Sequence, residues 1–203
     1  YKVEQISILK VEDRDGKVLE EFKPIEGKRV LSSQEAFLIS HILSDNNARL
    51  MTFGENSSIN IRGHQVAVKT GTTDDKRDNW TVGWNPNFIV GVWVGNNDNS
   101  MMKKVASGVT GAAPIWRRIV LEAIRRYGSN DFVVPQGIVT AEVDSVSGYR
   151  SHDDFPSRTE YFVEGTEPRG IDPVHVKLKV CKETGKIASA ICEEKGLAEE
   201  REF

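Results

Sequence analysis

Lys69-Thr70-Gly71-Thr72-Thr73 follows an apolar alternating run at residues 65–68 and begins the stretch that decides the fold. Two further runs, rich in β-branched and aromatic residues, follow at residues 79–84 and 88–95. Such alternation is typical of strands with one buried face, and short connections favour pairing between neighbours along the chain. The sequence therefore predicts three strands, at about 65–72, 79–84 and 88–95, in an antiparallel meander.

Two amphipathic helices are predicted on either side of these strands. Ser32-Ser33-Gln34-Glu35 indicates a helix N-terminus, and the apolar residues that follow repeat with helical period until Asp45-Asn46-Asn47. A second helix is predicted to have Pro114 in its first turn and to end at Gly128. Antiparallel strands covered by helices would make this part of the chain an α+β layered domain.

A β-hairpin is predicted near the start of the chain. Residues 6–11 and 18–20 are rich in residues that favour strands. Asp15-Gly16 lies between them, and this dipeptide is a strong signal for a hairpin turn.

Composition excludes several classes of protein. The chain has 203 residues and a formal net charge of −3, so it has no excess of positive charge for binding nucleic acid. No apolar run in the sequence approaches the roughly 20 residues that a transmembrane helix needs. The chain begins with Tyr1 rather than methionine and without a secretory signal, so we expect it to be part of a longer protein.

The stretch that decides the fold also carries a family resemblance. Lys-Thr-Gly is one of three short motifs of serine enzymes that attack β-lactams and D-alanyl-D-alanine peptides. Here it continues into Asp78-Asn79-Trp80-Thr81-Val82-Gly83-Trp84 and Phe88-Ile89-Val90-Gly91-Val92-Trp93-Val94-Gly95. This long pattern closely resembles the transpeptidase domain of class A (1A-type) penicillin-binding proteins, from about Ile6 to Pro168. The resemblance implies part of a fold of the penicillin-binding protein and serine β-lactamase type.

The resemblance also implies an activity and a cellular location. Proteins of this family cross-link peptidoglycan stem peptides by acyl transfer through an acyl-serine, and β-lactam antibiotics bind at the same site. Their parent chains also carry a peptidoglycan glycosyltransferase domain and an N-terminal membrane anchor. We therefore expect this chain to act with the upstream remainder of its transpeptidase domain at the extracytoplasmic face of the bacterial cell membrane. No cofactor and no nucleic-acid partner are expected.

The residues of the motif take their roles from the same resemblance. Lys69 supplies positive charge and helps proton transfer, and the N–H of Thr72 is one of two oxyanion-hole donors. The hydroxyls of Thr70 and Thr72 hold the carboxylate of the substrate, and Gly71 lets the substrate backbone approach the strand. A surface lysine at a strand end is the structural alternative. The residues expected to bind substrate are Thr70, Gly71, Thr72, Thr73 and Trp80.

The other two motifs of these enzymes also occur, but we interpret each occurrence as accidental. Ser7-Ile8-Leu9-Lys10 lies in a predicted strand, whereas serine and lysine three residues apart share a face only on a helix. Ser100-Met101-Met102-Lys103 follows the Lys-Thr-Gly strand, although the family's nucleophile precedes it. Ser44-Asp45-Asn46 lies at a predicted helix end, where polar residues serve as caps. We expect the nucleophilic serine upstream of Tyr1.

Beyond Pro135 helical periodicity stops and turn residues become dense. We therefore predict that residues 1–134 are the C-terminal part of a transpeptidase domain and that residues 135–203 form a small β-rich tail. Within this tail, Val143-Asp144-Ser145-Val146-Ser147-Gly148 resembles Val180-Cys181-Lys182-Glu183-Thr184-Gly185. This is an internal repeat, and we expect its second copy to be truncated.

Cys181 and Cys192 flank a short segment with a turn signal at Thr184-Gly185, so a hairpin would bring them together. We predict a disulfide because the family works where disulfides persist, and two unpaired thiols in a small core are the alternative. The first copy of the repeat has Asp144 and Asp154 near the equivalent positions. Without histidines at ligand spacing, the cysteines predict no zinc site, and no metal is expected.

Two other functions stay open. A D,D-carboxypeptidase or β-lactamase uses the same motifs, with water in place of the amine acceptor. The segment from Gly108 to Trp116 argues instead for the transpeptidase family. The second of these functions is that of a non-catalytic binding module, because the chain shows no convincing nucleophile and is expected to be inactive alone.

Overall fold

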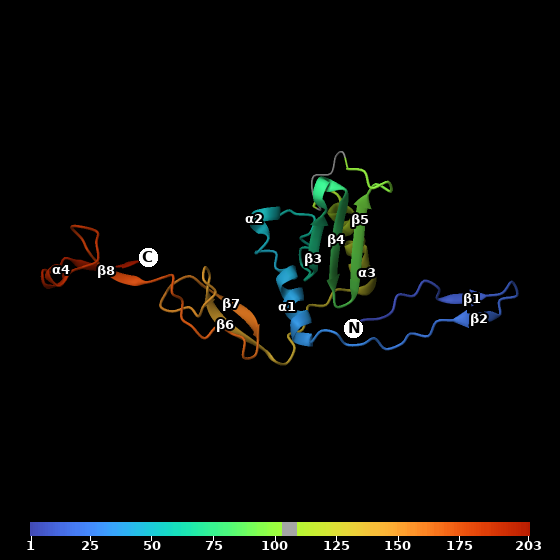
Figure 1. The fold of residues 1–203 in the computed structure, drawn as a ribbon, viewed down its shortest axis with the longest axis horizontal. Helices are drawn as coiled ribbons and strands as arrows, with labels where there is room; N and C mark the ends of the chain where they lie inside the picture. Colours follow the sequence, from blue (N-terminus) through green and yellow to red (C-terminus); the bar gives the residue numbers. More distant parts are fainter. Residues whose placement is uncertain (103–108) are drawn as a thin grey trace. The chain divides into compact units, whose positions relative to one another are not determined.

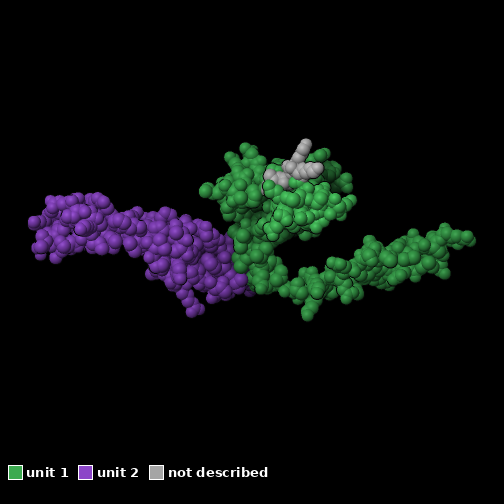
Figure 2. Space-filling view, turned by 45° about the horizontal axis from the view of Figure 1, so that its top comes forward, with its two compact units in different colours: residues 1–135 green, residues 136–203 purple. Residues whose placement is uncertain are grey.

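The structure of the chain is a computed structural model that describes residues 1–102 and 109–203. The chain divides into two compact units, unit 1 (Tyr1–Pro135) and unit 2 (Gln136–Phe203), which Figure 2 shows in different colours. Lys103 and Gly108, which belong to two of the sequence patterns, lie outside the described residues.

Unit 1 contains a three-stranded antiparallel sheet. Its strands are β3 (Ala67–Thr72), β4 (Asp78–Asn85) and β5 (Phe88–Gly95), in the order β3-β4-β5 (Figure 1). A short 3-10 turn, Asp74–Lys76, joins the first two strands. The predicted meander is confirmed, and the short connections explain it because they leave successive strands no other neighbour. With β4 in the middle, β3 is an edge strand.

The core of unit 1 lies between this sheet and α3 (Ala112–Tyr127). Trp116 of α3 is completely buried, and its Nε1 donates a hydrogen bond to the carbonyl of Val90 at 3.1 Å. Gly83 makes room for the indole, because a Cβ at this position would lie 2.4 Å from Trp116 Cζ2 and 2.7 Å from the carbonyl oxygen of Ala67. The other buried residues of this core are Ile59, Ile61, Val66, Val68, Val92, Ala112, Ala113 and Val120.

The first predicted helix, α1 (Ser33–Ser44), packs beside β3. It begins with a capping box, in which Glu35 N–H donates to Ser32 Oγ at 3.1 Å and Ser32 N–H donates to Glu35 Oε2 at 2.7 Å. Trp84 follows Gly83 and so lies on the opposite face of the sheet from Trp116. Its Nε1 donates to Ser40 Oγ of α1 at 3.1 Å. A short helix, α2 (Leu50–Phe53), follows α1.

The N-terminal hairpin forms, but its first strand is shorter than predicted. β1 (Lys10–Glu12) pairs with β2 (Val18–Glu21), and residues 6–9 lie outside the strand. Ile6, Ile8 and Leu9 are all exposed. Side chains that bury no face give little reason for a strand to extend, so β propensity alone was misleading here. The strand placement of Ser7 was therefore wrong.

Unit 2 consists of two antiparallel hairpins. β6 (Ile138–Asp144) pairs with β7 (Ser157–Val163), and β8 (Lys177–Cys181) pairs with β9 (Ala198–Glu202). A short helix, α4 (Ala190–Glu194), lies in the connection of the second hairpin. The predicted fold class, an α+β domain part followed by a β-rich tail, is confirmed.

The internal repeat of unit 2 is visible in backbone hydrogen bonds. In the first hairpin Gly148 N–H donates to the carbonyl of Asp144 at 3.0 Å, and in the second Gly185 N–H donates to that of Cys181 at 2.8 Å. Both glycines have positive φ, 72° and 68°, which the turn requires and which other residues adopt at a cost. Asp144 and Cys181 therefore occupy the same place in the two hairpins.

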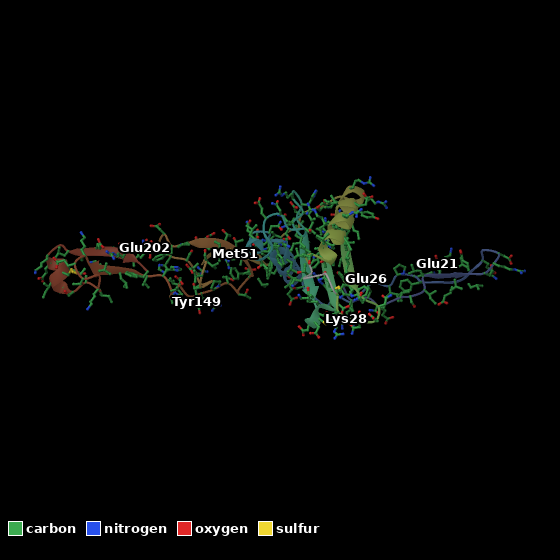
Figure 3. The ribbon with its side chains drawn as sticks, turned by 90° about the horizontal axis from the view of Figure 1, so that it is seen from above. Glu21, Glu26, Lys28, Met51, Tyr149 and Glu202 are labelled. Carbon is green, nitrogen blue, oxygen red and sulfur yellow. A yellow bond between two sulfur atoms is a disulfide. The ribbon has the colours of Figure 1, made fainter. Side chains whose placement is uncertain are left out.

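Cys181 and Cys192 form a disulfide, with a Cα–Cα distance of 5.9 Å (Figure 3). Continuing the repeat from Asp144 and Cys181, the first-copy equivalent of Cys192 is Phe155, and both are buried. The equivalence with Asp154 was wrong, because the side chain of Asp154 is 96% exposed. In each copy the side chain at this position faces the interior of the hairpin. Burying a carboxylate there without a hydrogen-bond partner would cost free energy.

Candidate functional site

The Lys-Thr-Gly residues lie in the second half of β3, at the edge of the sheet (Figure 1). Thr73, just beyond the strand, donates its N–H to the carbonyl of Asp78 at 3.0 Å. Successive residues of an antiparallel strand direct their N–H and C=O groups to opposite sides. The main-chain groups of Gly71 therefore point toward β4, whereas those of Thr70 and Thr72 point toward the outer edge of the sheet. A strand edge of this kind can pair with an extended peptide.

Lys69 brings a positive charge to the same edge. Its side chain is exposed, and Nζ donates a hydrogen bond to the carbonyl oxygen of Thr70 at 2.7 Å. A hollow of about 170 Å³ adjoins Lys69 and Thr70, between β3 and the end of α1. Its walls are Ile42, Leu43, Asp45, Ala48, Arg49, Phe53, Ile59, Val68, Lys69 and Thr70. A larger hollow of about 890 Å³, along the N-terminal segments at residues 2–6 and 22–28, includes none of the motif residues.

Thr72 is held by a residue that sequence reasoning missed. Asn79 is completely buried in β4, and its Nδ2 donates to Thr72 Oγ1 at 3.2 Å. Its Oδ1 accepts the N–H of Ala112, the first residue of α3, at 2.7 Å. Asn79 thereby links the hydroxyl of the motif to the start of the helix that covers the core. A polar residue within an apolar strand pattern was the available signal, since buried amides normally have a specific partner.

Gly71 and Trp80 lie opposite each other in the β3–β4 pairing. A Cβ at Gly71 would meet only Trp80 Cβ, at 3.7 Å, which is ordinary van der Waals contact. The fold itself therefore does not require glycine at this position. Trp80 is 47% exposed, so its ring presents apolar surface to solvent beside the motif. The structure thus brings Trp80 next to the Lys-Thr-Gly strand.

Ser44-Asp45-Asn46 lies where α1 ends. Asp45 is the C-cap residue, and its carboxylate accepts the N–H groups of Asn47 and Ala48 at 2.8 and 3.2 Å. Ser44 Oγ donates back to the carbonyl of His41 at 3.0 Å. Arg49 closes the helix end by donating to the carbonyl of Asp45 at 3.1 Å, and burial lowers the pKa of its guanidinium. These contacts give the segment a structural role.

Neither serine of the two Ser-x-x-Lys patterns lies in a helix. Ser7 lies in an irregular segment, and the ammonium group of Lys10 forms an ion pair with Glu12 of the same strand. Ser100 follows β5 in a turn where its N–H donates to Asp98 Oδ1 at 3.1 Å. Within residues 1–102 and 109–203, the only group of side chains close enough to hold a metal ion is Asp144, Asp172 and His175 of unit 2.

Comparison with known proteins agrees with the family resemblance and with the fold. Residues 134–177 match the family described as penicillin-binding protein 1A, C-terminal domain. Penicillin-binding protein 1A of Clostridium botulinum (strain Langeland) is 34% identical over 187 residues, which are 89% of this chain and 22% of the relative. The chain is similar to the C-terminal part of 1A-type penicillin-binding proteins. The resemblance that the sequence suggests is thereby confirmed.

Two further relatives extend the comparison. Penicillin-binding protein 1A of Aquifex aeolicus is 32% identical over 161 residues, or 79% of this chain and 22% of the relative. The crystal structure of penicillin-binding protein 1A from Haemophilus influenzae matches 81% of this chain and 30% of its own, with a TM-score of 0.61 and 24% identity. The second match supports the fold. The chain spans about a fifth of the length of the first two relatives, as the 22% coverage shows.

None of the helices within the described ranges 1–102 and 109–203 is long and apolar enough to cross a membrane.

Proposed function

We propose that this chain supplies the Lys-Thr-Gly wall of a serine D,D-transpeptidase site that cross-links peptidoglycan stem peptides and reacts with β-lactams. The observation that carries the proposal is the β3 edge. There the main-chain groups of Thr70 and Thr72 point outward and the ammonium group of Lys69 lies 2.7 Å from the carbonyl oxygen of Thr70. An extended D-alanyl-D-alanine peptide can pair with this edge as an additional strand.

Each residue of the wall then has a chemical task. The N–H of Thr72 stabilises the oxyanion that forms when a serine oxygen attacks the carbonyl of the penultimate D-alanine. Terminal D-alanine leaves with a proton, an acyl-serine remains, and an amine of a second stem peptide then displaces the serine. Lys69 provides positive charge and helps move the proton. The fold does not require a glycine at position 71, since a Cβ there would meet only Trp80. This supports a role for Gly71 in letting the substrate backbone approach the strand closely.

The substrate carboxylate is assigned to the hydroxyls of Thr70 and Thr72. Thr72 Oγ1 accepts a hydrogen bond from Asn79 Nδ2 at 3.2 Å, which fixes the position of this hydroxyl. A carboxylate needs donors, so Asn79 orients Thr72 for this task. Thr73 and Trp80 complete the wall beside the substrate. A charge-assisted hydrogen bond of this type contributes about 1.5–3 kcal/mol.

The nucleophile is assigned to a segment of a longer protein that precedes this chain in sequence. In this arrangement residues 1–134 belong to the transpeptidase domain and residues 135–203 to an appended module. The longer protein is bifunctional, with a peptidoglycan glycosyltransferase domain, and works outside the cytoplasmic membrane. The similarity to relatives that are several times longer supports this arrangement.

Covalent labelling with fluorescent penicillin tests the proposal. The 203-residue chain should not be labelled, whereas the longer protein that contains it should form an acyl-enzyme. In the longer protein, Lys69→Ala should slow acylation by roughly 10²–10⁴-fold, because it removes a charge and a proton-transfer group. Lys17→Ala, in the distant hairpin turn, is the matched control and should acylate at the parental rate.

Two results would contradict the assignment. Acylation of Lys69→Ala at the parental rate would remove the role of this lysine. A penicillin adduct on Ser7, Ser44 or Ser100 of the isolated chain, found by peptide mass spectrometry, would show that the nucleophile lies within it. Release of free peptide acid instead of cross-linked peptide, with an amine acceptor present, would favour the D,D-carboxypeptidase alternative.

A further inference from the structure

Unit 2 contains a buried carboxylate that the proposed function does not use. Asp144, the last residue of β6, is completely buried. Its Oδ1 accepts the N–H groups of Val146 and Ser147 at 2.9 and 2.8 Å, which shapes the turn after the strand. Its Oδ2 is also buried and accepts no hydrogen bond. A buried oxygen of an ionised carboxylate without a partner is costly, so something is expected to compensate it.

Two further side chains converge on this oxygen. Nδ1 of His175 lies 2.9 Å from Asp144 Oδ2 and 2.9 Å from Asp172 Oδ2. A ring nitrogen carries at most one hydrogen, and the geometry of a hydrogen bond is met toward Asp172. His175 Nδ1 therefore lies close to Asp144 Oδ2 but donates no hydrogen bond to it. One ligand atom from each residue lies within 4.8 Å of the others.

The backbone holds these three residues in place independently of any ion. Asp172 N–H donates to the carbonyl of Arg150 at 2.9 Å, and Arg150 N–H donates to the carbonyl of Gly170 at 3.0 Å. Asp172 in turn accepts the N–H of His175 at 2.8 Å. His175 also packs against Phe155, with ring centroids 5.2 Å apart. The cluster is therefore preorganised, as a cation site needs to be.

The second hairpin contains a disulfide, and the first hairpin does not. Cys181 occupies the place of Asp144, and there a disulfide to Cys192 ties the end of the strand to the following segment. Small units with little apolar core are commonly held by disulfides or by structural metals. The first hairpin has no cysteine; Asp144 stands at the place of Cys181, and Asp172 and His175 come from the segment that connects the two hairpins.

We propose that Asp144, Asp172 and His175 bind a divalent transition-metal ion, with zinc as the fitting case, and that this ion holds the first hairpin as the disulfide holds the second. One imidazole nitrogen and two carboxylate oxygens form a donor set that suits zinc better than calcium, which prefers oxygen alone. Two carboxylates and a neutral imidazole also leave a net charge that a divalent ion neutralises. The sequence predicts no metal site. The proposal departs from that prediction because Asp172 and His175 are distant in sequence from Asp144 and only the fold brings the three residues together.

The test is binding of Zn²⁺ by the 203-residue chain after removal of metal with a chelator. The disulfide is kept oxidised, so that no thiolate competes for the ion. We expect one Zn²⁺ per chain by calorimetry and by elemental analysis, and a higher melting temperature of the first hairpin with Zn²⁺ than with the chelator. Hydrogen exchange should show the added protection in β6 and β7 rather than in β8 and β9.

Asp144→Asn is the decisive variant. An asparagine keeps a carbonyl oxygen for the N–H groups of Val146 and Ser147, so the turn should form, but it removes the unpartnered anionic oxygen. Zinc affinity should fall by about 100-fold or more, since loss of even a supporting partner of a ligand typically costs 10–100-fold. His175→Gln should have a similar effect. Asp154→Asn, an exposed carboxylate in the same unit, is the matched control and should bind as the parent does.

Three outcomes would overturn the proposal. They are no saturable binding of Zn²⁺ at one per chain, undiminished binding by both Asp144→Asn and His175→Gln, and binding of Ca²⁺ in preference to Zn²⁺. Because the assay needs no penicillin reaction, its failure would leave the transpeptidase proposal unaffected.

Discussion

In unit 1 one face of the β3-β4-β5 sheet is buried against α3 around Trp116, whereas the hairpins of unit 2 bury few apolar side chains. The buried apolar residues of unit 2 are Val143, Phe155, Val180, Cys181 and Cys192. Over this face unit 1 is held by apolar packing together with the hydrogen bonds from Trp116 to Val90 and from Ala112 to Asn79. In unit 2 a disulfide and a network of buried carboxylates and imidazole supplement a small core.

The difference explains why the candidate site lies where it does. A sheet that is anchored through one face can leave a strand edge available, and β3 has such an edge. A two-stranded hairpin has no second layer of its own, so its side chains are committed to holding it together. Packing in unit 1 therefore permits the chemistry proposed for Lys69 and Thr72.

The largest effect is expected from Trp116→Ala. The substitution removes the largest completely buried side chain and leaves a cavity between sheet and helix, so the free energy of unfolding of unit 1 should fall by about 3–5 kcal/mol. Trp80→Ala, where the ring is 47% exposed, should cost much less. Denaturant unfolding, with hydrogen exchange as the probe, would measure the loss of unfolding free energy for both variants. Equal losses for the two variants would mean that Trp116 does not anchor the core.

Reduction of the disulfide should affect the second hairpin only. Cys181 and Cys192 are 11 residues apart, and closing a loop of this order stabilises by roughly 3 kcal/mol in the chain-entropy model. With reductant, amides of β8 and β9 should lose protection, while those of β6 and β7 should not. Intact mass after alkylation, with and without reductant, establishes the bridge first. Two free thiols in oxidatively folded protein would refute it.

Two glycines of the sheet, Gly83 and Gly71, are expected to respond differently to substitution by alanine, the first in stability and the second in acylation. Gly83→Ala places a methyl group 2.4 Å from Trp116 Cζ2 and should cost about 1–3 kcal/mol through overpacking. Gly71→Ala meets only Trp80 at 3.7 Å, so stability should change little. In the longer protein, Gly71→Ala should nevertheless slow acylation by penicillin. A large stability loss at Gly71 would show that the fold, rather than the substrate, requires this glycine.

The capping box of α1 should contribute less. Ser32→Ala removes the hydroxyl that accepts the N–H of Glu35, at an expected cost of about 1 kcal/mol. The hydrogen bonds from Ser32, first of all that from its backbone N–H, hold the pKa of Glu35 below its ordinary value. Ser33→Ala is the control because Ser33 is the first residue within the helix rather than its cap. Thermal unfolding that ranks Ser33→Ala as the more harmful would contradict the capping assignment.

The smallest effect concerns Glu122 on the exposed side of α3. Hydrogen bonds from Arg125, and then from Arg126, lower the pKa of its carboxyl to about 2. A carboxyl with a depressed pKa stabilises the folded state above its ordinary pKa of 4.5 and loses this contribution as the pH falls toward 2. Glu122→Gln should therefore reduce stability slightly at pH 7 and should make no difference near pH 2. A difference that persists at pH 2 would point to packing instead.

Much of unit 1 could be predicted from local patterns. The three strands, the capping box at Ser32 and the end of α3 at Gly128 all follow from periodicity and from residues with strong conformational preferences. The short first strand of the hairpin was missed, because the exposure of Ile6 and Ile8 depends on what they could pack against. Local propensity does not contain that information.

The sequence by itself determined the Lys-Thr-Gly strand, its neighbours and the family that they resemble, because these depend on contiguous residues. Only the tertiary structure decided that Asn79 links Thr72 to Ala112, that Phe155 rather than Asp154 matches Cys192, and that Asp144 lies beside His175. Such contacts join residues far apart in the chain or depend on which side of a strand faces inward. Their physical cause is burial, because packing decides which side chains face inward and which partners lie within reach of a buried polar group.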